Sequence, residues 1–264
     1  MNRASSATGW VRNPDGTLGW TWNPITGCLN GCEYCYARKL ANTRLKERYL
    51  ANNNLAPLIG EGIVPYHTTR MLDAIDPFYP RFWEDRLFQP FNDKHISQKG
   101  IFVCDMSDLF GIGIPEKWTK AVMDVMEDCP TDRFYLLTKQ YQNLPQWSPF
   151  PDNCWVGVTV TNWIMLPDAL YNLSKIEAQI KYISFEPLLE FVPIDGLNLV
   201  KHGINWVIIG AQTKPYKPPK WEWVSEIIDA CVDAGIPYFL KNNLEPIVPK
   251  VFGGEGELRQ EMPE

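Results

Sequence analysis

The chain has 264 residues, of which 45% are hydrophobic and 21% are charged, and this composition excludes an intrinsically disordered protein. The net charge of -6 argues against a protein that coats nucleic acid through a broad basic surface. No apolar run reaches the roughly 20 residues that span a bilayer, and the N-terminus has no apolar stretch typical of a signal peptide. We therefore expect a soluble, cytoplasmic protein with no membrane contact.

Short apolar runs recur along the chain and predict strands that are buried on both faces. The first covers residues 19–23, and six more follow at 101–104, 134–138, 155–160, 182–185, 206–209 and 238–240. Helical patterns separate several of them: one helix is expected over 36–50, one from Pro115, and one from Trp221 to a stop at Gly235. This alternation is typical of βα units around a parallel sheet, so the sequence predicts an α/β fold.

One domain is expected over residues 1–250. Residues 52–99 contain five prolines and many aromatic residues without a clean period, and they are interpreted as an insertion between the first and second βα units. Residues 251–264 are rich in Gly and Glu, which predicts a mobile tail.

Polar residues follow most of the predicted strands. In parallel α/β architectures the carboxyl ends of the strands open toward a common mouth, where functional groups gather. The polar residues near these strand ends are Asp105, Ser107, Asp108, Thr138, Lys139, Thr159, Thr161, Asn162, Ser184, Glu186, Gln212, Lys241, Asn242 and Asn243. Loops are often polar for other reasons, so this pattern locates a mouth without defining its chemistry.

Three of the seven cysteines, Cys28, Cys32 and Cys35, share one loop after the first predicted strand, with the spacing C-x3-C-x2-C. A random arrangement would give about 0.005 such triplets, so the spacing is not accidental. An odd number of cysteines in a chain without secretory features argues against a disulfide framework. A structural zinc site needs four ligands, whereas three thiolates on a four-iron cluster leave one iron open to a small molecule.

The run CLNGCEYC resembles the signature of the radical S-adenosylmethionine (radical SAM) superfamily, whose cysteine loop follows the first strand of a partial TIM-type barrel. Tyr34 stands where that signature places an aromatic residue. The stretches TWNPITGC, MSDLF, LLTK, FEPLL and WVIIG further resemble a branch first noted among phage proteins, over about residues 20–245. The resemblance implies a partial TIM-type (β/α)6-like barrel of parallel strands.

The resemblance also implies a mechanism. Cys28, Cys32 and Cys35 would hold a 4Fe-4S cluster with S-adenosyl-L-methionine on its open iron. One electron, from a flavodoxin- or ferredoxin-type donor of low potential, would cleave the sulfonium and give a 5'-deoxyadenosyl radical that abstracts hydrogen from substrate. Residues expected to bind the cofactor or line the site are Tyr34, Tyr36, Asp105, Ser107, Asp108, Thr138, Lys139, Thr159, Glu186 and Gln212.

Three of these assignments rest on position. The superfamily's Gly-Gly-Glu motif after the second strand, which holds the methionine amino group, is absent, and Asp105, Ser107 and Asp108 stand in its place. The alternative is that the two aspartates cap the following turn.

Two further residues are weak catalytic candidates. Glu186 is a candidate catalytic residue or the partner of a nearby Lys or Arg. Cys104 is a candidate hydrogen-atom donor or a core residue.

The substrate is open: a nucleic-acid base, DNA, RNA or a nucleotide, in base modification or repair, is the first candidate, and a peptide or small metabolite is the alternative. Two basic segments suggest contact with phosphate: residues 36–50, with Arg44 and Arg48 beside the apolar stripe, and the loop of Lys214, Lys217 and Lys220. Two alternatives remain: a non-enzymatic binding protein stabilised by zinc or a cluster, and a degenerate barrel that no longer uses SAM.

Overall fold

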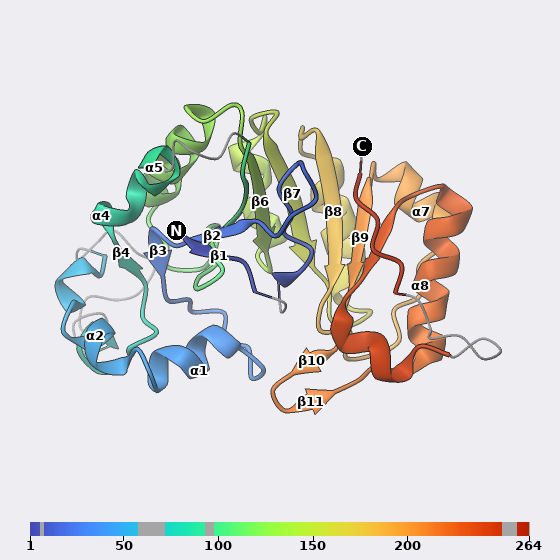
Figure 1. Ribbon diagram of the computed structural model, residues 1–264, viewed down its shortest axis with the longest axis horizontal. Coiled ribbons are helices and arrows are strands. Elements are labelled where there is room, and N and C mark those ends of the chain that lie inside the picture. Colours follow the sequence, from blue (N-terminus) through green and yellow to red (C-terminus); the bar gives the residue numbers. More distant parts are fainter. Residues whose placement is uncertain (6–7, 58–71, 93–97, 250–257, 264) are drawn as a thin grey trace. The chain divides into compact units, whose positions relative to one another are not determined.

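The computed structural model describes residues 1–5, 8–57, 72–92, 98–249 and 258–263. The chain divides into two compact units (Figure 1). Unit 1 comprises residues 1–3 and 12–140, and unit 2 comprises residues 4–11 and 141–264. Within the described residues, no helix is both long and apolar enough to cross a membrane.

The sheet of unit 1 carries four strands in the order β1-β2-β5-β6. They are β1 (Asn2–Arg3), β2 (Trp20–Trp22), β5 (Gly100–Val103) and β6 (Arg133–Thr138). Strands β2, β5 and β6 run parallel, and β1 pairs antiparallel with β2. The carboxyl ends of the three parallel strands therefore meet at one edge of this unit, as the sequence predicted.

A second, smaller pairing in unit 1 joins β3 (Ile25–Thr26) to β4 (Arg81–Phe82), antiparallel. Strand β4 lies in the predicted insertion, so part of the insertion packs directly on the segment that precedes the cysteines. The rest of the described insertion contains η2 (Asn53–Leu55), α4 (Glu84–Leu87) and η3 (Gln89–Asn92).

The helix predicted over residues 36–50 is two helices, α1 (Tyr36–Asn42) and α2 (Lys46–Leu50). The break falls at Thr43, which leaves the helical region with φ -120° and ψ -96°. Its hydroxyl donates to the carbonyl of Lys39 at 2.7 Å, a local bond that competes with helical hydrogen bonding. The prediction of one continuous helix is therefore wrong. Helix α5 (Glu116–Glu127) begins after Pro115, as expected.

Unit 2 contains four parallel strands in the order β7-β8-β9-β12. They are β7 (Cys154–Thr159), β8 (Ile180–Phe185), β9 (Trp206–Ile209) and β12 (Tyr238–Leu240). Three helices and a two-stranded hairpin connect them: α6 (Met165–Ser174), α7 (Gly196–Lys201), α8 (Trp221–Ala234) and the pair β10 (Gln212–Thr213) with β11 (Tyr216–Lys217). Short 3-10 turns complete the unit at Tyr141–Asn143, Pro145–Trp147 and Asn242–Ile247.

Aromatic side chains fill the core of unit 2. The ring of Trp10 lies 6.1 Å from Tyr182 and 6.2 Å from Trp206, so the N-terminal segment is packed into this unit. Residues 258–263 run beside β12: Leu240 N donates to Arg259 O, and Glu261 N donates to Tyr238 O. Part of the predicted tail thus has backbone partners, while residues 250–257 lie outside the described residues.

The predicted α/β class with parallel strands is confirmed in both units. Helix α8 also ends as expected, because Gly235 adopts the left-handed conformation with φ 66° at its C-terminus. The partial barrel stays a prediction.

Candidate functional site

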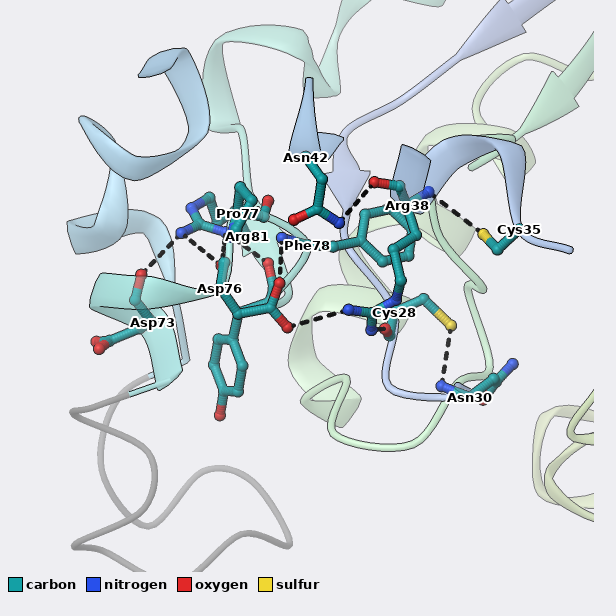
Figure 2. Close-up of polar contacts among 11 residues, drawn as sticks. Cys28, Asn30, Cys35, Arg38, Asn42, Asp73, Asp76, Pro77, Phe78 and Arg81 are labelled. Carbon is teal, nitrogen blue, oxygen red and sulfur yellow. Dashed lines mark hydrogen bonds and ion pairs between the residues drawn. The ribbon is translucent and has the colours of Figure 1, made fainter. Parts of the chain in front are cut away.

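The three predicted ligands lie on a segment that we call the cysteine loop, residues 27–36, which follows β3 and ends in the first turn of α1. All three thiols are free and half-buried. Backbone N–H groups donate to two of the sulfurs: Asn30 N to Cys28 Sγ at 3.4 Å and Arg38 N to Cys35 Sγ at 3.3 Å (Figure 2). Cys35 thereby caps the N-terminus of α1, where negative charge on sulfur is favoured.

Cys28 is electrostatically coupled to its neighbours. Burial first, and then the negative charge of Asp108, raise the pKa of the Cys28 thiol to about 12, with smaller contributions from Cys32 and Cys35 and an opposing one from the Asn30 N–H. The thiols of the loop are therefore near enough to oppose one another's ionisation. A positive group bound between them would remove this repulsion, as a metal does for coordinating thiolates.

Several contacts from the insertion fix the start of the loop. Cys28 N donates to Phe78 O at 3.0 Å. Arg38 donates to Cys28 O at 3.1 Å and forms an ion pair with Asp76 at 3.3 Å (Figure 2). Gly27 has φ 88°, and a Cβ there would stand 2.3 Å from Tyr79 O. The insertion thus sets the backbone path into the cysteine loop.

The three residues expected to bind the methionine amino group contact the cysteine loop instead. Ser107 Oγ donates to Gly27 O at 2.5 Å. Asp108 Oδ2 accepts from Asn30 Nδ2 at 2.9 Å, and Tyr36 OH donates to Asp105 Oδ2 at 3.0 Å. These long-range bonds bring the carboxyl end of β5 against the cysteine loop.

Asp108 is buried and has four hydrogen-bond donors. Besides Asn30, they are Thr138 Oγ1 at 2.7 Å, Lys139 N at 3.0 Å and Phe110 N at 3.2 Å. The bond to Phe110 N is the local turn cap that the sequence left open as an alternative. The bonds to Thr138 and Lys139 join β5 to β6, so both predicted residues of β6 lie in the same cluster as the loop.

Asp105 forms a second cluster. Asn23 Nδ2 donates to its Oδ1 at 2.5 Å, and Tyr36 OH also reaches its carbonyl oxygen at 2.6 Å. Burial raises the pKa of Asp105, against hydrogen bonds from Asn23 and Tyr36 that lower it. The preceding residue, Cys104, is buried with φ 59°, and burial raises the pKa of its thiol. An inert, buried thiol fits the core alternative for Cys104 better than an exposed reactive one.

The predicted aromatic residue of the signature, Tyr34, is half-buried, and the amine of Lys139 lies 5.8 Å from the centre of its ring. This places a cation beside the aromatic side chain that precedes the last cysteine. Such a pair offers a flat apolar surface and a positive charge to one ligand.

The remaining predicted residues belong to unit 2. Thr159 is buried at the end of β7, and Gln212 begins β10 and donates to Pro215 O at 3.0 Å. Glu186 forms an ion pair with Lys241, whose side chain is 4% exposed. Burial lowers the pKa of Lys241 to about 7. Pairing with a lysine was one of the two alternatives for Glu186, and the structure confirms that contact.

Three residues that contact the predicted set were missing from the sequence analysis: Asn23, Asn30 and Gln140. Gln140 Nε2 donates to Asn30 Oδ1 at 2.9 Å, which extends the Asp108 cluster. Asn23 directly follows β2, so the strand-end rule would have found it, as it found Lys241 after β12. Asn30 stands between two of the cysteines, and nothing in the spacing alone marked it.

Iron-sulfur clusters are held by Cys thiolates and tuned by hydrogen bonds to the sulfurs. Within the described residues, no group of three or more His, Cys, Asp or Glu side chains is arranged to hold a metal ion. The donor chemistry of the loop nevertheless fits an iron-sulfur group, because it combines three free thiols with N–H donors to two of them. Two of the three histidines, His67 and His95, lie outside the described residues.

Comparison with known proteins gives one match. A family described as "Protein of unknown function (DUF5131)" matches residues 16–247. The chain belongs to this family. That range contains the cysteine loop and every strand-end residue discussed above, so these features lie within the family's domain. No curated protein and no solved structure matches the chain.

Proposed function

We propose that this protein is a cytoplasmic radical SAM enzyme with a partial (β/α) barrel fold. The observation that carries the proposal is the C-x3-C-x2-C loop after the first parallel strand, with three free thiols and N–H donors to Cys28 and Cys35. A thiolate set with N–H···S bonds is the usual environment of an iron-sulfur cluster.

Cys28, Cys32 and Cys35 hold the 4Fe-4S cluster in this proposal. When bound, the cluster and S-adenosyl-L-methionine supply the reductive cleavage that yields a 5'-deoxyadenosyl radical, with the electron from a flavodoxin- or ferredoxin-type donor. The chain's own residues bind, orient and exclude water. Tyr34 offers its ring to the adenine, and Lys139 beside it offers a positive charge to the methionine carboxylate.

The polar residues of unit 2 serve the substrate side of the proposed reaction. The carboxylate of Glu186 is held by Lys241, so it is a fixed hydrogen-bond acceptor. Thr159 ends β7 and Gln212 follows β9, so both stand at strand ends of the same unit and are proposed to contact the substrate.

The decisive experiment is an electron paramagnetic resonance spectrum of anaerobically reconstituted, reduced protein, with and without S-adenosyl-L-methionine. We expect about four irons per chain and a reduced-cluster signal that changes when the cofactor is added. Alanine at Cys28, Cys32 or Cys35 removes the signal, whereas Cys129→Ala, a buried cysteine at the end of α5, leaves it.

Two other outcomes would contradict the proposal. A colourless protein that retains about one zinc per chain would indicate the non-enzymatic zinc-stabilised protein. A cluster signal that does not respond to S-adenosyl-L-methionine would indicate the degenerate barrel.

For the substrate we propose a nucleic-acid base or nucleotide, on the strength of the exposed basic residues around Arg44. Arg44→Ala is expected to weaken binding of a short DNA or RNA and to reduce its salt dependence, measured by fluorescence anisotropy. Lys201→Ala, at the last turn of α7, is the matched control. Equal binding by both variants would remove the basis of this substrate assignment.

A further inference from the structure

The segment after β5 contacts the cysteine loop at three separate points. Ser107 bonds to Gly27, directly before Cys28. Asp108 bonds to Asn30, between Cys28 and Cys32, and Asp105 bonds to Tyr36, directly after Cys35. We call Asp105, Ser107 and Asp108 the loop clamp. Along the sequence, its three contacts fall before Cys28, between Cys28 and Cys32, and after Cys35.

The carboxylate of Asp108 has no acceptor position to spare. Its Oδ1 accepts from Thr138 Oγ1 and Phe110 N, and its Oδ2 accepts from Asn30 Nδ2 and Lys139 N. An ionised carboxylate offers about four lone-pair sites, and these four donors occupy them. A ligand ammonium group would have to displace one of the bonds that hold the loop or join it to β6.

The four donors to Asp108 are all neutral groups: a hydroxyl, a side-chain amide and two backbone N–H groups. They orient the carboxylate without cancelling its charge. Asp108 is 5% exposed, so solvent screens that charge weakly. Through its bond to Asn30, the carboxylate stands beside the segment between Cys28 and Cys32, so its charge opposes the addition of negative charge to a group bound there.

We propose that the loop clamp consists of positioning residues for the cysteine loop, and that the Asp108 charge lowers the reduction potential of a cluster bound there. The second part rests on the proposed function, and the first does not. The clamp therefore fixes where the three sulfurs stand, and Asp108 makes the bound group harder to reduce.

The positioning role is tested on the protein without metal, by hydrogen exchange of the backbone amides of the cysteine loop. Asn30→Ala is expected to accelerate exchange at Asn30 about tenfold, as for the loss of ~1.4 kcal/mol, with a smaller effect at Cys35. Tyr36→Phe should reverse that order. Asp124→Asn, which removes an exposed carboxylate from α5, is the control for loss of a charge in the redox titration described next. Unchanged exchange in both loop variants would overturn the positioning role.

The electrostatic role is tested by redox titration of the reconstituted protein. Asp108→Asn removes the charge together with the acceptor for one pair of donors, so the midpoint potential should rise by more than it changes in Asn30→Ala, which releases the loop alone. Asn30→Ala releases the loop and keeps the charge, so its potential should stay near that of the wild type. Equal potentials in Asp108→Asn and the wild type would overturn this role. A wild-type protein that takes up no cluster would refute the proposed function and leave the exchange experiment intact.

Discussion

The position of Gly27 requires glycine for two reasons, its positive φ and its close approach to Tyr79. Its φ of 88° is strained for any residue with a Cβ, and that Cβ would stand 2.3 Å from the carbonyl oxygen of Tyr79. Gly27→Ala is therefore expected to lower the free energy of unfolding by roughly 3 kcal/mol or more, measured by urea denaturation. Gly16→Ala separates the two causes, because Gly16 has φ 83° with nothing within 4 Å, and it should cost about 1 kcal/mol. Equal losses would show that the contact with Tyr79 is unimportant.

The lowered pKa of the buried Lys241 side chain predicts that the stability of the fold depends on pH. Burial lowers its pKa from the ordinary 10.5 to about 7, so between these values the unfolded chain binds more protons than the folded one. Stability from this group therefore increases as the pH rises from 7 toward 10.5, because the cost of burying the charged amine disappears. Comparison of the wild type with Lys241→Met by urea unfolding at pH 7 and pH 9.5 isolates the effect. Between pH 7 and pH 9.5, the free energy of unfolding of the wild type should rise relative to that of the variant. The same pH dependence in both proteins would contradict a lowered pKa for Lys241.

At the scale of elements, the short pair β3 and β4 depends on one buried cation. Arg81 at the start of β4 is fully buried, and its guanidinium donates to Tyr79 O at 2.7 Å and to Asp73 O at 2.8 Å (Figure 2). Two strands of two residues each cannot hold together through two backbone pairs alone. Arg81 therefore ties the turn before β4 into a fixed shape, and through β3 it supports the cysteine loop.

Arg81→Lys tests this dependence, because a single ammonium group cannot reach both carbonyl oxygens. We expect a loss of about 3 kcal/mol in thermal or urea unfolding, with faster trypsin cleavage in unit 1. Arg44→Lys, on an exposed position before α2, should change stability by no more than about 0.5 kcal/mol. A similar small effect at Arg81 would show that its hydrogen bonds do not hold the pair.

At the scale of the whole molecule, the sequence predicted what apolar runs and capping residues determine locally. Strands β2, β5 and β9 match the predicted runs because each is short and mostly apolar. The pairing of β3 with β4 could not be predicted, since two residues have no period. The contacts of Asp105 and Asp108 were also beyond reach, because their partners lie about 70 to 80 positions away, whereas the strand-end rule correctly placed both aspartates beside the cysteines.

A cluster bound to the cysteine loop should stabilise the protein against thermal unfolding. The loop is held by contacts from β5, β6 and the insertion, so a group that binds only the folded loop shifts the unfolding of unit 1. We expect the anaerobically reconstituted protein to unfold several degrees above the metal-free form in calorimetry. Cys35→Ala should remove that difference. An unchanged midpoint in reconstituted wild-type protein with full iron content would contradict this coupling.

Unit 2 combines two separate stretches of the chain, residues 4–11 and 141–264, and this affects how it can fold during synthesis. Residues 4–11 are translated before residues 12–140 of unit 1, yet Trp10 packs against Tyr182 and Trp206, which are translated long afterwards. Unit 1, by contrast, has all of its residues once Gln140 has been added. During synthesis an indole side chain at the N-terminus therefore stays without its native neighbours while unit 1 is completed, and it is a ready contact for a chaperone that binds exposed apolar groups.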